Sequence, residues 1–381
     1  MQTTGSPLSP RVSVIMPVRD GAQFLAEAMT SILTQTETDL ELLVVDDGST
    51  DDSAAIASST GDPRVRVLSG NGKGEGAARN IGLDNARGRW IAWHDADDVA
   101  VPHRLSSLLA AVAGGADFAH SDMVFVDAAG ATTGYLRSSA IPREHVLPFF
   151  LREGTPFNNP TMLIRGALVS ELRFEESLVV GVDTDFVRRF APYSTGVHVP
   201  QPLTLYRRHE GSISLGAGPD VLYPHVAHFL DTEPLTALVP EAFREYPGTD
   251  ADAVAAAVVG LSLFRRGFPH AAVQWIELAL TRSTPACEPV VGAVVALASG
   301  NASEVVRTLR SCRETALTTC LVGDALARAG DLPAASTSYL RALAIDPLSY
   351  DAVAGLRATG GRLGLRVVDD PRRRLLGVGE A

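Results

Sequence analysis

Residues 40–51 read Leu-Glu-Leu-Leu-Val-Val-Asp-Asp-Gly-Ser-Thr-Asp, and this stretch decides the predicted fold. Its first six residues predict a buried β-strand, because apolar and β-branched side chains dominate them. Two aspartates and a glycine then end the strand, as is typical of a turn. Asp51 and Asp52 suit the start of a short helix. The stretch therefore predicts a strand that leads through a polar turn into a helix.

Similar strands lie on either side of this stretch, and each is followed by helical sequence. The predicted strands are Val12–Met16, Val65–Leu68 and Trp90–Trp93. The predicted helices are Ala22–Gln35, about Ala77–Ala86 and one that begins at Pro102. Alternating strands and helices predict an α/β fold, with a mixed, mainly parallel sheet and helices on both faces. Ligands of such sheets bind at the carboxyl ends of the strands.

Beyond residue 121 the pattern becomes mixed. Strands are predicted at Met123–Val126, Thr161–Ile164 and Pro202–Tyr206, with a helix at Asp183–Phe190. We interpret this region as the second half of the same domain, the half that would bind the second substrate, the acceptor.

The last third of the chain contains an internal repeat with helical spacing. The spacing of Gly260, Ala272 and Ala279 recurs at Gly323, Ala335 and Ala342, and a degenerate copy lies between them. Small residues let paired helices approach closely, and Gly267 and Gly330 suit the turns between the helices. The pattern resembles tetratricopeptide repeats and predicts an all-α repeat domain. An irregular alanine-rich bundle is the alternative.

These patterns predict five parts of the chain. They are a tail at 1–10, the α/β domain at 11–215, a linker with connecting helices at 216–250, helical repeats at 251–360 and a second tail at 361–381. Gly216–Pro219 is the candidate linker. We expect the helical repeats to bind a protein partner or a second copy of the chain.

Charge and composition exclude several classes of protein. With 46% hydrophobic and 20% charged residues, the 381-residue chain is typical of a globular protein. Its net charge of −11 argues against nucleic-acid binding and requires local cations or a metal for any anionic ligand. Three cysteines without paired histidines predict neither a zinc site nor a disulfide framework. No signal peptide or membrane span is predicted. We expect a cytoplasmic protein and leave contact with a membrane surface open.

Asp95 and Asp97 follow the strand at Trp90–Trp93 in the order Asp-x-Asp. Such a pair at a strand end offers hard oxygen ligands to Mg²⁺ or Mn²⁺. A metal held there would neutralise a departing diphosphate. The alternative is helix capping, in which Asp97 or Asp98 accepts hydrogen bonds from free N–H groups of the following helix.

The motifs between Val12 and Leu105 resemble the donor-binding half of inverting family-2 glycosyltransferases with the GT-A fold. The residues that carry the resemblance are Val12–Pro17, Glu41–Asp51, Ala77–Gly82 and Asp95–Asp98. The resemblance implies transfer of a sugar from a nucleotide-diphosphate donor, with a UDP-sugar favoured, to a hydroxyl of a glycan, a lipid-linked acceptor or a small molecule.

The resemblance also implies roles for single residues on the donor side. Asp47 matches the aspartate that contacts the base or ribose, and Pro17 shapes the strand end beneath the base. Arg79 matches an arginine near the donor, and Lys73 and Arg19 are further candidate donor-binding cations. Arg19 and its neighbour Asp20 stand where the family commonly has an aromatic residue and an asparagine.

On the acceptor side, an inverting transfer requires one carboxylate to take the proton of the acceptor hydroxyl. Asp183 aligns with the family's acidic pair and is the candidate base, with Asp185 as the alternative. Val182 replaces the usual first acid of that pair. His209 lies in the segment that closes many of these domains, where a histidine reaches the metal or the diphosphate. An ordinary surface histidine is the alternative.

Two other functions fit the sequence less well. A sugar nucleotidylyltransferase requires a glycine-rich loop with an arginine directly after the first strand, where this chain has Pro17–Gly21. A non-catalytic scaffold would combine a degenerate transferase domain with the helical repeats. The presence of Asp95, Asp97 and Asp183 argues against a scaffold.

Overall fold

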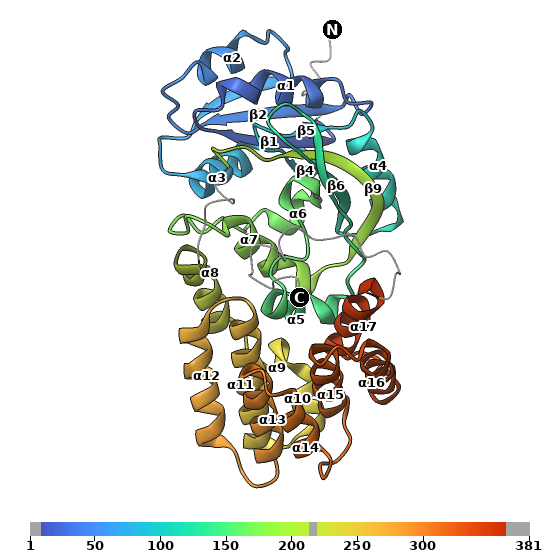
Figure 1. The fold of residues 1–381 in the computed structure, drawn as a ribbon. Helices are drawn as coiled ribbons and strands as arrows, with labels where there is room; N and C mark the ends of the chain where they lie inside the picture. The colour runs from blue at the N-terminus through green and yellow to red at the C-terminus, as the bar shows by residue number, and fades with distance from the viewer. Residues whose placement is uncertain (1–8, 213–218, 363–381) are drawn as a thin grey trace. The chain divides into compact units, whose positions relative to one another are not determined.

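The computed structural model describes residues 9–212 and 219–362 (Figure 1). The chain divides into two compact units. The first unit comprises positions up to 143 and from 155 to 226, and the second comprises 144–154 and positions from 227 onward. The candidate linker and both predicted tails lie mostly or wholly outside the described residues.

The first unit is built on one mixed sheet with the strand order β3-β2-β1-β4-β8-β6-β9-β5, and β7 pairs with β6 (Figure 1). Its strands are β1 (Val12–Val18), β2 (Leu40–Asp46), β3 (Val65–Ser69), β4 (Trp90–Trp93), β5 (Val99–Ala100), β6 (Phe118–Val126), β7 (Thr132–Leu136), β8 (Leu163–Arg165) and β9 (Gly196–Arg207). Strands β1 to β4 are parallel to one another, and β6 is parallel to β9. Strand β8 is antiparallel to both β4 and β6. The predicted mixed sheet is thus confirmed.

Helices lie between the strands, as the alternating sequence pattern predicts. They are α1 (Ala22–Leu33), α2 (Ser53–Ser59), α3 (Glu75–Asn85), α4 (Arg104–Ala111), α6 (Gly166–Val169), α7 (Val182–Phe190) and α8 (Pro219–Thr232), with short 3-10 turns at Val112–Gly114, Arg143–His145, Asn159–Thr161 and Ala191–Tyr193. Helix α4 begins at Arg104 rather than at Pro102. Helix α8 runs across the division between the two units.

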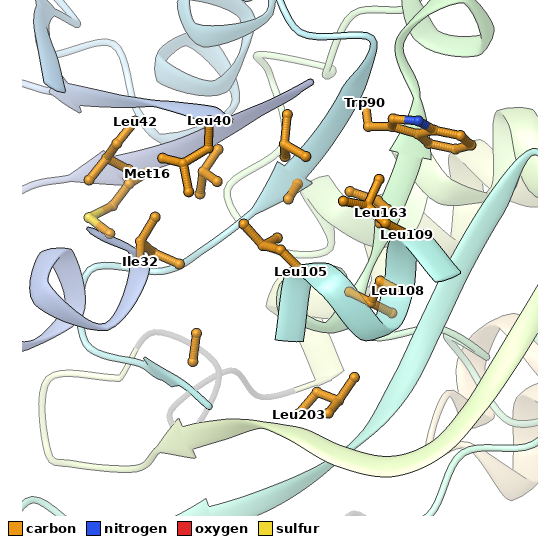
Figure 2. Close-up of a cluster of buried hydrophobic side chains, with 14 of the residues drawn as sticks. Met16, Ile32, Leu40, Leu42, Trp90, Leu105, Leu108, Leu109, Leu163 and Leu203 are labelled. Atoms are coloured by element: carbon orange, nitrogen blue, oxygen red, sulfur yellow. The ribbon is translucent and has the colours of Figure 1, made fainter. Parts of the chain in front are cut away.

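Both faces of the parallel strands β1, β2 and β4 are buried, which explains their nearly continuous apolar sequence, whereas β3 is partly exposed. Alternate residues of β1 and β2 pack with α1 and α4 in one core, where Met16, Ile32, Leu42 and Leu105 lie together (Figure 2). Ile15 points to the opposite face and contacts α3. A Cβ atom built on Gly82 of α3 would lie 2.3 Å from Ile15, so glycine permits this close approach.

The second unit consists of stacked helix pairs (Figure 1). Its helices are α5 (Val146–Arg152), α9 (Leu235–Leu238), α10 (Pro240–Glu245), α11 (Gly248–Arg265), α12 (Pro269–Arg282), α13 (Glu288–Ala298), α14 (Ala302–Leu309), α15 (Ala316–Arg328), α16 (Leu332–Ile345) and α17 (Tyr350–Arg362). Gly267, Gly300 and Gly330 adopt positive φ in the turns within the pairs. The predicted helix pairs are present, while the tetratricopeptide class remains a prediction.

Helix α5 comes from the middle of the first unit's sequence but belongs to the helical unit. Arg152 forms ion pairs with Glu241 and Asp351, and its side chain is only 7% exposed. His145 bonds through Nε2 to the carbonyl oxygen of Leu348 at 2.8 Å. The helical unit is therefore assembled from two separate stretches of the chain.

The three cysteines are free thiols. Among the described residues, no helix combines the length and the apolar character that crossing a membrane requires.

Candidate active site

The carboxyl ends of β1, β2 and β4 share one edge of the sheet, because these strands are parallel neighbours. This edge holds the predicted donor and metal residues Pro17, Arg19, Asp47, Asp95 and Asp97. Pro17 is half-buried within β1, whereas Arg19 is exposed just beyond the strand. The predicted convergence of separate motifs on one edge is therefore present in the structure.

The side chain of Asp47 binds the glycine-rich loop. Its two carboxylate oxygens accept hydrogen bonds from the backbone N–H groups of Lys73 (3.0 Å) and Gly74 (2.8 Å). Gly72 and Gly74 have positive φ, which glycine adopts without strain. Asp47 is buried, whereas the side chain of Lys73 is exposed. Asp47 thus fixes the loop that leads into α3.

Arg79 on α3 connects the glycine-rich loop to the Asp-x-Asp segment. Its Nη2 atom pairs with Glu75 at 2.5 Å and with Asp95 at 2.9 Å. The guanidinium carbon lies 5.8 Å from the centre of the Trp93 ring and 5.6 Å from that of Phe174. The side chain is 2% exposed, and its Nε and Nη1 atoms have no hydrogen-bond partner within the described residues. Two guanidinium nitrogens of Arg79 are therefore buried without a described hydrogen-bond partner.

Asp97 and His209 form the second pair at this edge. Oδ2 of Asp97 lies 3.0 Å from Nε2 of His209. Nδ1 of His209 accepts a hydrogen bond from the backbone N–H of Gly211 at 3.2 Å. The neutral imidazole therefore carries its proton on Nε2 and donates it to Asp97. Metal-binding histidines donate the N–H of the other ring nitrogen to an acceptor, so a metal at Nε2 would require the His209 proton to move to Nδ1 and the bond from Gly211 to break.

Asp183 and Asp185 both lie in the first turn of α7 but differ in their surroundings. Asp185 is buried and forms ion pairs with Arg188 and Arg189, each at 2.8 Å. Asp183 is half-buried and accepts a hydrogen bond from the N–H of Thr184 at 2.8 Å. The ion pairs of Asp185 give it a structural role in α7. Asp183 has no ion pair among the described residues.

Electrostatics link Asp183 to the donor edge. Burial acts to lower the pKa of the Arg79 guanidinium. The negative charges of Glu75, Asp95 and Asp183 outweigh the effect of burial, so this pKa is raised above its usual value. Burial also raises the pKa of Asp95 to about 7; Arg79 opposes this shift, whereas Glu75, Asp97 and Asp183 add to it. Asp95 is therefore close to three other carboxylates, and one arginine compensates them only in part.

A divalent cation fits this set of residues. Asp95, Asp97 and His209 offer the oxygen and nitrogen donors that Mg²⁺ and Mn²⁺ accept. Burial is the main cause of the raised pKa of Asp95, and the nearby carboxylates of Glu75, Asp97 and Asp183 add to it; a bound cation would offset their charge. Within the described residues, no three acidic, histidine or cysteine side chains are already arranged as a metal site. In this conformation Asp95 and Asp97 are instead paired with Arg79 and His209, respectively.

Sequence reasoning assigned no role to Glu75 or Arg207, and it considered Asp98 only as a helix cap. The carboxylate of Asp98 is fully buried; its Oδ1 atom accepts a hydrogen bond from the backbone N–H of Arg207 at 2.9 Å. Glu75 stands four residues before Arg79, a spacing that suits an ion pair on a helix. No comparable local signal connects Asp98 to Arg207, because 109 residues separate them.

A model of the family described as glycosyl transferase family 2 matches residues 13–169, which include the donor edge and the strands around it. Residues 13–169 are therefore similar to the glycosyl transferase family 2 domain. The helical unit lies outside the matched residues, apart from α5.

Two curated proteins are similar to parts of this chain. The chain is 31% identical over 220 residues to the succinoglycan biosynthesis protein ExoO of Rhizobium meliloti, covering 54% of this chain and 63% of that protein. It is 42% identical over 97 residues to an uncharacterized glycosyltransferase of Rickettsia prowazekii, covering 26% of this chain and 30% of that protein. The matched regions thus span less than two thirds of either relative.

The fold is also similar to that of a solved structure, TarS of S. aureus. The TM-score is 0.51 at 16% sequence identity, over 79% of this chain and 54% of that chain. This likeness concerns the fold alone, and it extends beyond residues 13–169 into the helical unit.

Proposed function

We propose that this chain transfers a sugar from a nucleotide-diphosphate donor to an acceptor hydroxyl, with inversion at the anomeric carbon. The observation that carries the proposal is the meeting of Arg79, Asp95, Asp97 and His209 at the carboxyl edge of the sheet. Asp183 lies within electrostatic reach of the same groups. This set combines cationic, metal-binding and proton-accepting groups, and the reaction requires all three.

On the donor side, Asp95, Asp97 and His209 would hold Mg²⁺ or Mn²⁺. The bound cation would supply positive charge that stabilises the departing diphosphate. Arg79 would place its positive charge beside the donor, and the exposed cations Lys73 and Arg19 would add to the local positive charge. Such cations matter because the chain as a whole is acidic.

The nucleotide would lie against the ends of β1 and β2. We assign its base or ribose to Asp47 and Pro17. Asp47 already accepts two backbone hydrogen bonds from the glycine-rich loop, but each carboxylate oxygen retains a second lone pair for the ligand. Asp47 would therefore bind the nucleotide and fix the loop at the same time.

Asp183 would act as the general base. Its carboxylate takes the proton from the acceptor hydroxyl while the hydroxyl oxygen attacks the anomeric carbon. The bond between that carbon and the phosphate oxygen breaks, and the nucleoside diphosphate leaves with the electron pair. Asp183 suits this role better than Asp185, which is held by two arginines.

The acceptor is proposed to be a glycan hydroxyl. The relative named for succinoglycan biosynthesis supports this class. The helical unit is proposed to bind a protein partner or a second copy of the chain. In its support, Val273 and Leu280 lie seven residues apart on α12 and are 52% and 50% exposed.

A donor screen tests the proposal. The melting temperature of the full chain is measured with UDP-glucose, UDP-N-acetylglucosamine and GDP-mannose, each with Mn²⁺ or with EDTA. We expect at least one donor to raise the melting temperature only with Mn²⁺, UDP-sugars being the first candidates. NMR of the product formed from that donor should show an inverted anomeric configuration. Retention of configuration, or no stabilisation by any donor, would refute the proposal.

A further inference from the structure

Arg207 at the end of β9 contacts the Asp-x-Asp segment from two sides. Its backbone N–H donates to Oδ1 of Asp98 at 2.9 Å, and its Nε donates to the carbonyl oxygen of Asp97 at 2.8 Å. The side chain is 4% exposed. One arginine thus fixes both the main chain of Asp97 and the side chain of the next residue.

The other guanidinium nitrogens connect Arg207 to two further segments. Nη2 pairs with Glu27 of α1 at 2.7 Å, and Nη1 donates to the carbonyl oxygen of Ala128 after β6 at 3.1 Å. A lysine has a single nitrogen without the planar fork and cannot reproduce these contacts together. The arrangement therefore specifically requires arginine.

Phe24 extends this arrangement to His209. The guanidinium carbon of Arg207 lies 4.7 Å from the centre of the Phe24 ring. The ring of His209 packs against Phe24 with a centroid separation of 4.9 Å. Arg207 therefore fixes the main chain of Asp97 directly and the His209 ring through Phe24. The carboxylate of Asp97 and the ring of His209 meet at 3.0 Å, so Arg207 contacts the supports of both residues.

We propose that Arg207 is a positioning residue that sets the geometry of the Asp97–His209 pair. Arg207 acts through its neighbours and does not contact the donor. The metal-binding consequence of this inference rests on the proposed function. The geometric part concerns the metal-free protein and can be tested separately.

The first measurement uses the full chain without metal. ¹⁵N NMR of the histidine rings identifies His209 by the loss of its signals in His209→Gln. Wild type should show the Nε2–H tautomer that the Gly211 bond imposes. Arg207→Lys should give a mixture of tautomers. Arg66→Lys is the matched control, because Arg66 also bridges a carboxylate, Glu41, and a carbonyl group, that of Asn85, but has no contact with the site.

The second measurement is a Mn²⁺ titration followed by electron paramagnetic resonance in the presence of UDP. We expect Arg207→Lys to weaken Mn²⁺ binding by about 10- to 100-fold, the usual scale for a residue that orients metal ligands. Arg66→Lys should bind like wild type. Glu27→Gln should also stay close to wild type, because it removes only the partner on the exposed side.

Each outcome decides a separate claim. If Arg207→Lys keeps the wild-type tautomer and Mn²⁺ affinity, the inference is wrong. If wild type binds no Mn²⁺, the metal part of the proposed function fails, and the tautomer measurement alone decides the positioning role. If Arg207→Lys does not fold, Phe24→Leu decides instead. It removes the ring that touches both Arg207 and His209, so an unchanged His209 tautomer in this variant would overturn the inference.

Discussion

Oδ2 of Asp97 lies 3.0 Å from Nε2 of His209, although 112 residues separate the two side chains in the sequence. The short strand β5 explains how they meet. Val99 of β5 pairs in antiparallel register with Leu205 of β9, so the segment before β5, which holds Asp97, runs beside the end of β9, which His209 follows. The pairing of the edge strand β5 with β9 therefore brings a histidine from the end of the domain to the Asp-x-Asp segment.

Substitutions in α7 should separate the general base from the structural carboxylate. Asp183→Asn keeps the size of the side chain but removes the proton acceptor. We expect turnover to fall by roughly 100-fold or more, with little change in donor affinity. Turnover is measured in a transfer assay, and donor affinity by calorimetry with a nucleoside diphosphate and Mn²⁺.

Asp185→Asn is the matched comparison. This substitution leaves Arg188 and Arg189 without their carboxylate, so we expect a loss of about 3 kcal/mol in the free energy of unfolding. Urea denaturation measures this loss. An active Asp183→Asn beside a folded but inactive Asp185→Asn would move the base to Asp185. Full activity in both variants would exclude the mechanism.

The bond between Asp47 and the glycine-rich loop gives a prediction for proteolysis. Asp47→Ala removes the acceptor of the Lys73 and Gly74 N–H groups, so the loop should open and trypsin should cleave faster after Lys73. Donor affinity should fall at the same time. Asp46→Ala is the control, because Asp46 bonds to Ser49 in the neighbouring turn. Equal cleavage rates in the two variants would argue that Asp47 does not hold the loop.

The buried ion pairs of the helical unit should make its stability depend on pH. Burial raises the pKa of Glu241 to about 7 despite its pairing with Arg152. A carboxyl group whose pKa is raised in the folded state stabilises the fold at low pH, and this contribution is lost as the pH rises through about 7. The free energy of unfolding of wild type should therefore fall by on the order of 2–3 kcal/mol between pH 4.5 and pH 7 because of Glu241.

Glu241→Gln removes the carboxyl group that titrates. The free energy of unfolding of this variant should therefore depend less on pH between pH 4.5 and pH 7 than that of wild type. Chemical denaturation at several pH values, followed by helical circular dichroism, compares the two proteins. The same pH slope in both would show that Glu241 does not titrate in this range.

The two units are predicted to fold separately. A fragment that holds the first unit alone would still contain α5, because α5 lies within the sequence of the first unit but belongs to the second. Val146, Leu147, Phe150 and Leu151 are buried in the helical unit. A fragment of residues 9–226 should therefore aggregate, because it exposes these side chains. Replacing residues 144–154 with a Gly/Ser segment of equal length should give a monomer that still binds the donor. Light scattering and calorimetry check both properties. Loss of donor binding in a folded, monomeric fragment would show that the site needs the helical unit.

Local sequence patterns were sufficient to predict the strands that carry Pro17, Asp47, Asp95 and Asp97 and the sheet edge that these residues share. The strands around Val12–Met16 and Leu40–Val45 are continuous apolar runs, and the polar residues directly after them must lie at one edge of a parallel sheet. The same reasoning placed Asp95 and Asp97. Helical spacing also predicted the paired helices, because Gly260 and Gly323 lie where the paired helices pack closely.

Other features depend on contacts that no local pattern records. The bonds of Arg207 to Asp97 and Asp98 join residues more than a hundred positions apart. Helix α5 is a short apolar segment that could complete either core, and long-range contacts such as the ion pairs of Arg152 with Glu241 and Asp351 assign it to the helical unit. The acceptor half of the site depends on such long-range contacts, and its chemistry is correspondingly harder to predict from sequence.

The most direct test of the central claim is calorimetry of UDP binding, with Mn²⁺ and with EDTA, to wild type and to Asp97→Ala. If Asp97 and His209 hold the cation that compensates the diphosphate, wild type should bind UDP at least roughly 10-fold more tightly with Mn²⁺ than with EDTA. Asp97→Ala should lose most of this difference. Equal affinity of wild type in Mn²⁺ and EDTA, or an undiminished Mn²⁺ effect in Asp97→Ala, would contradict the account.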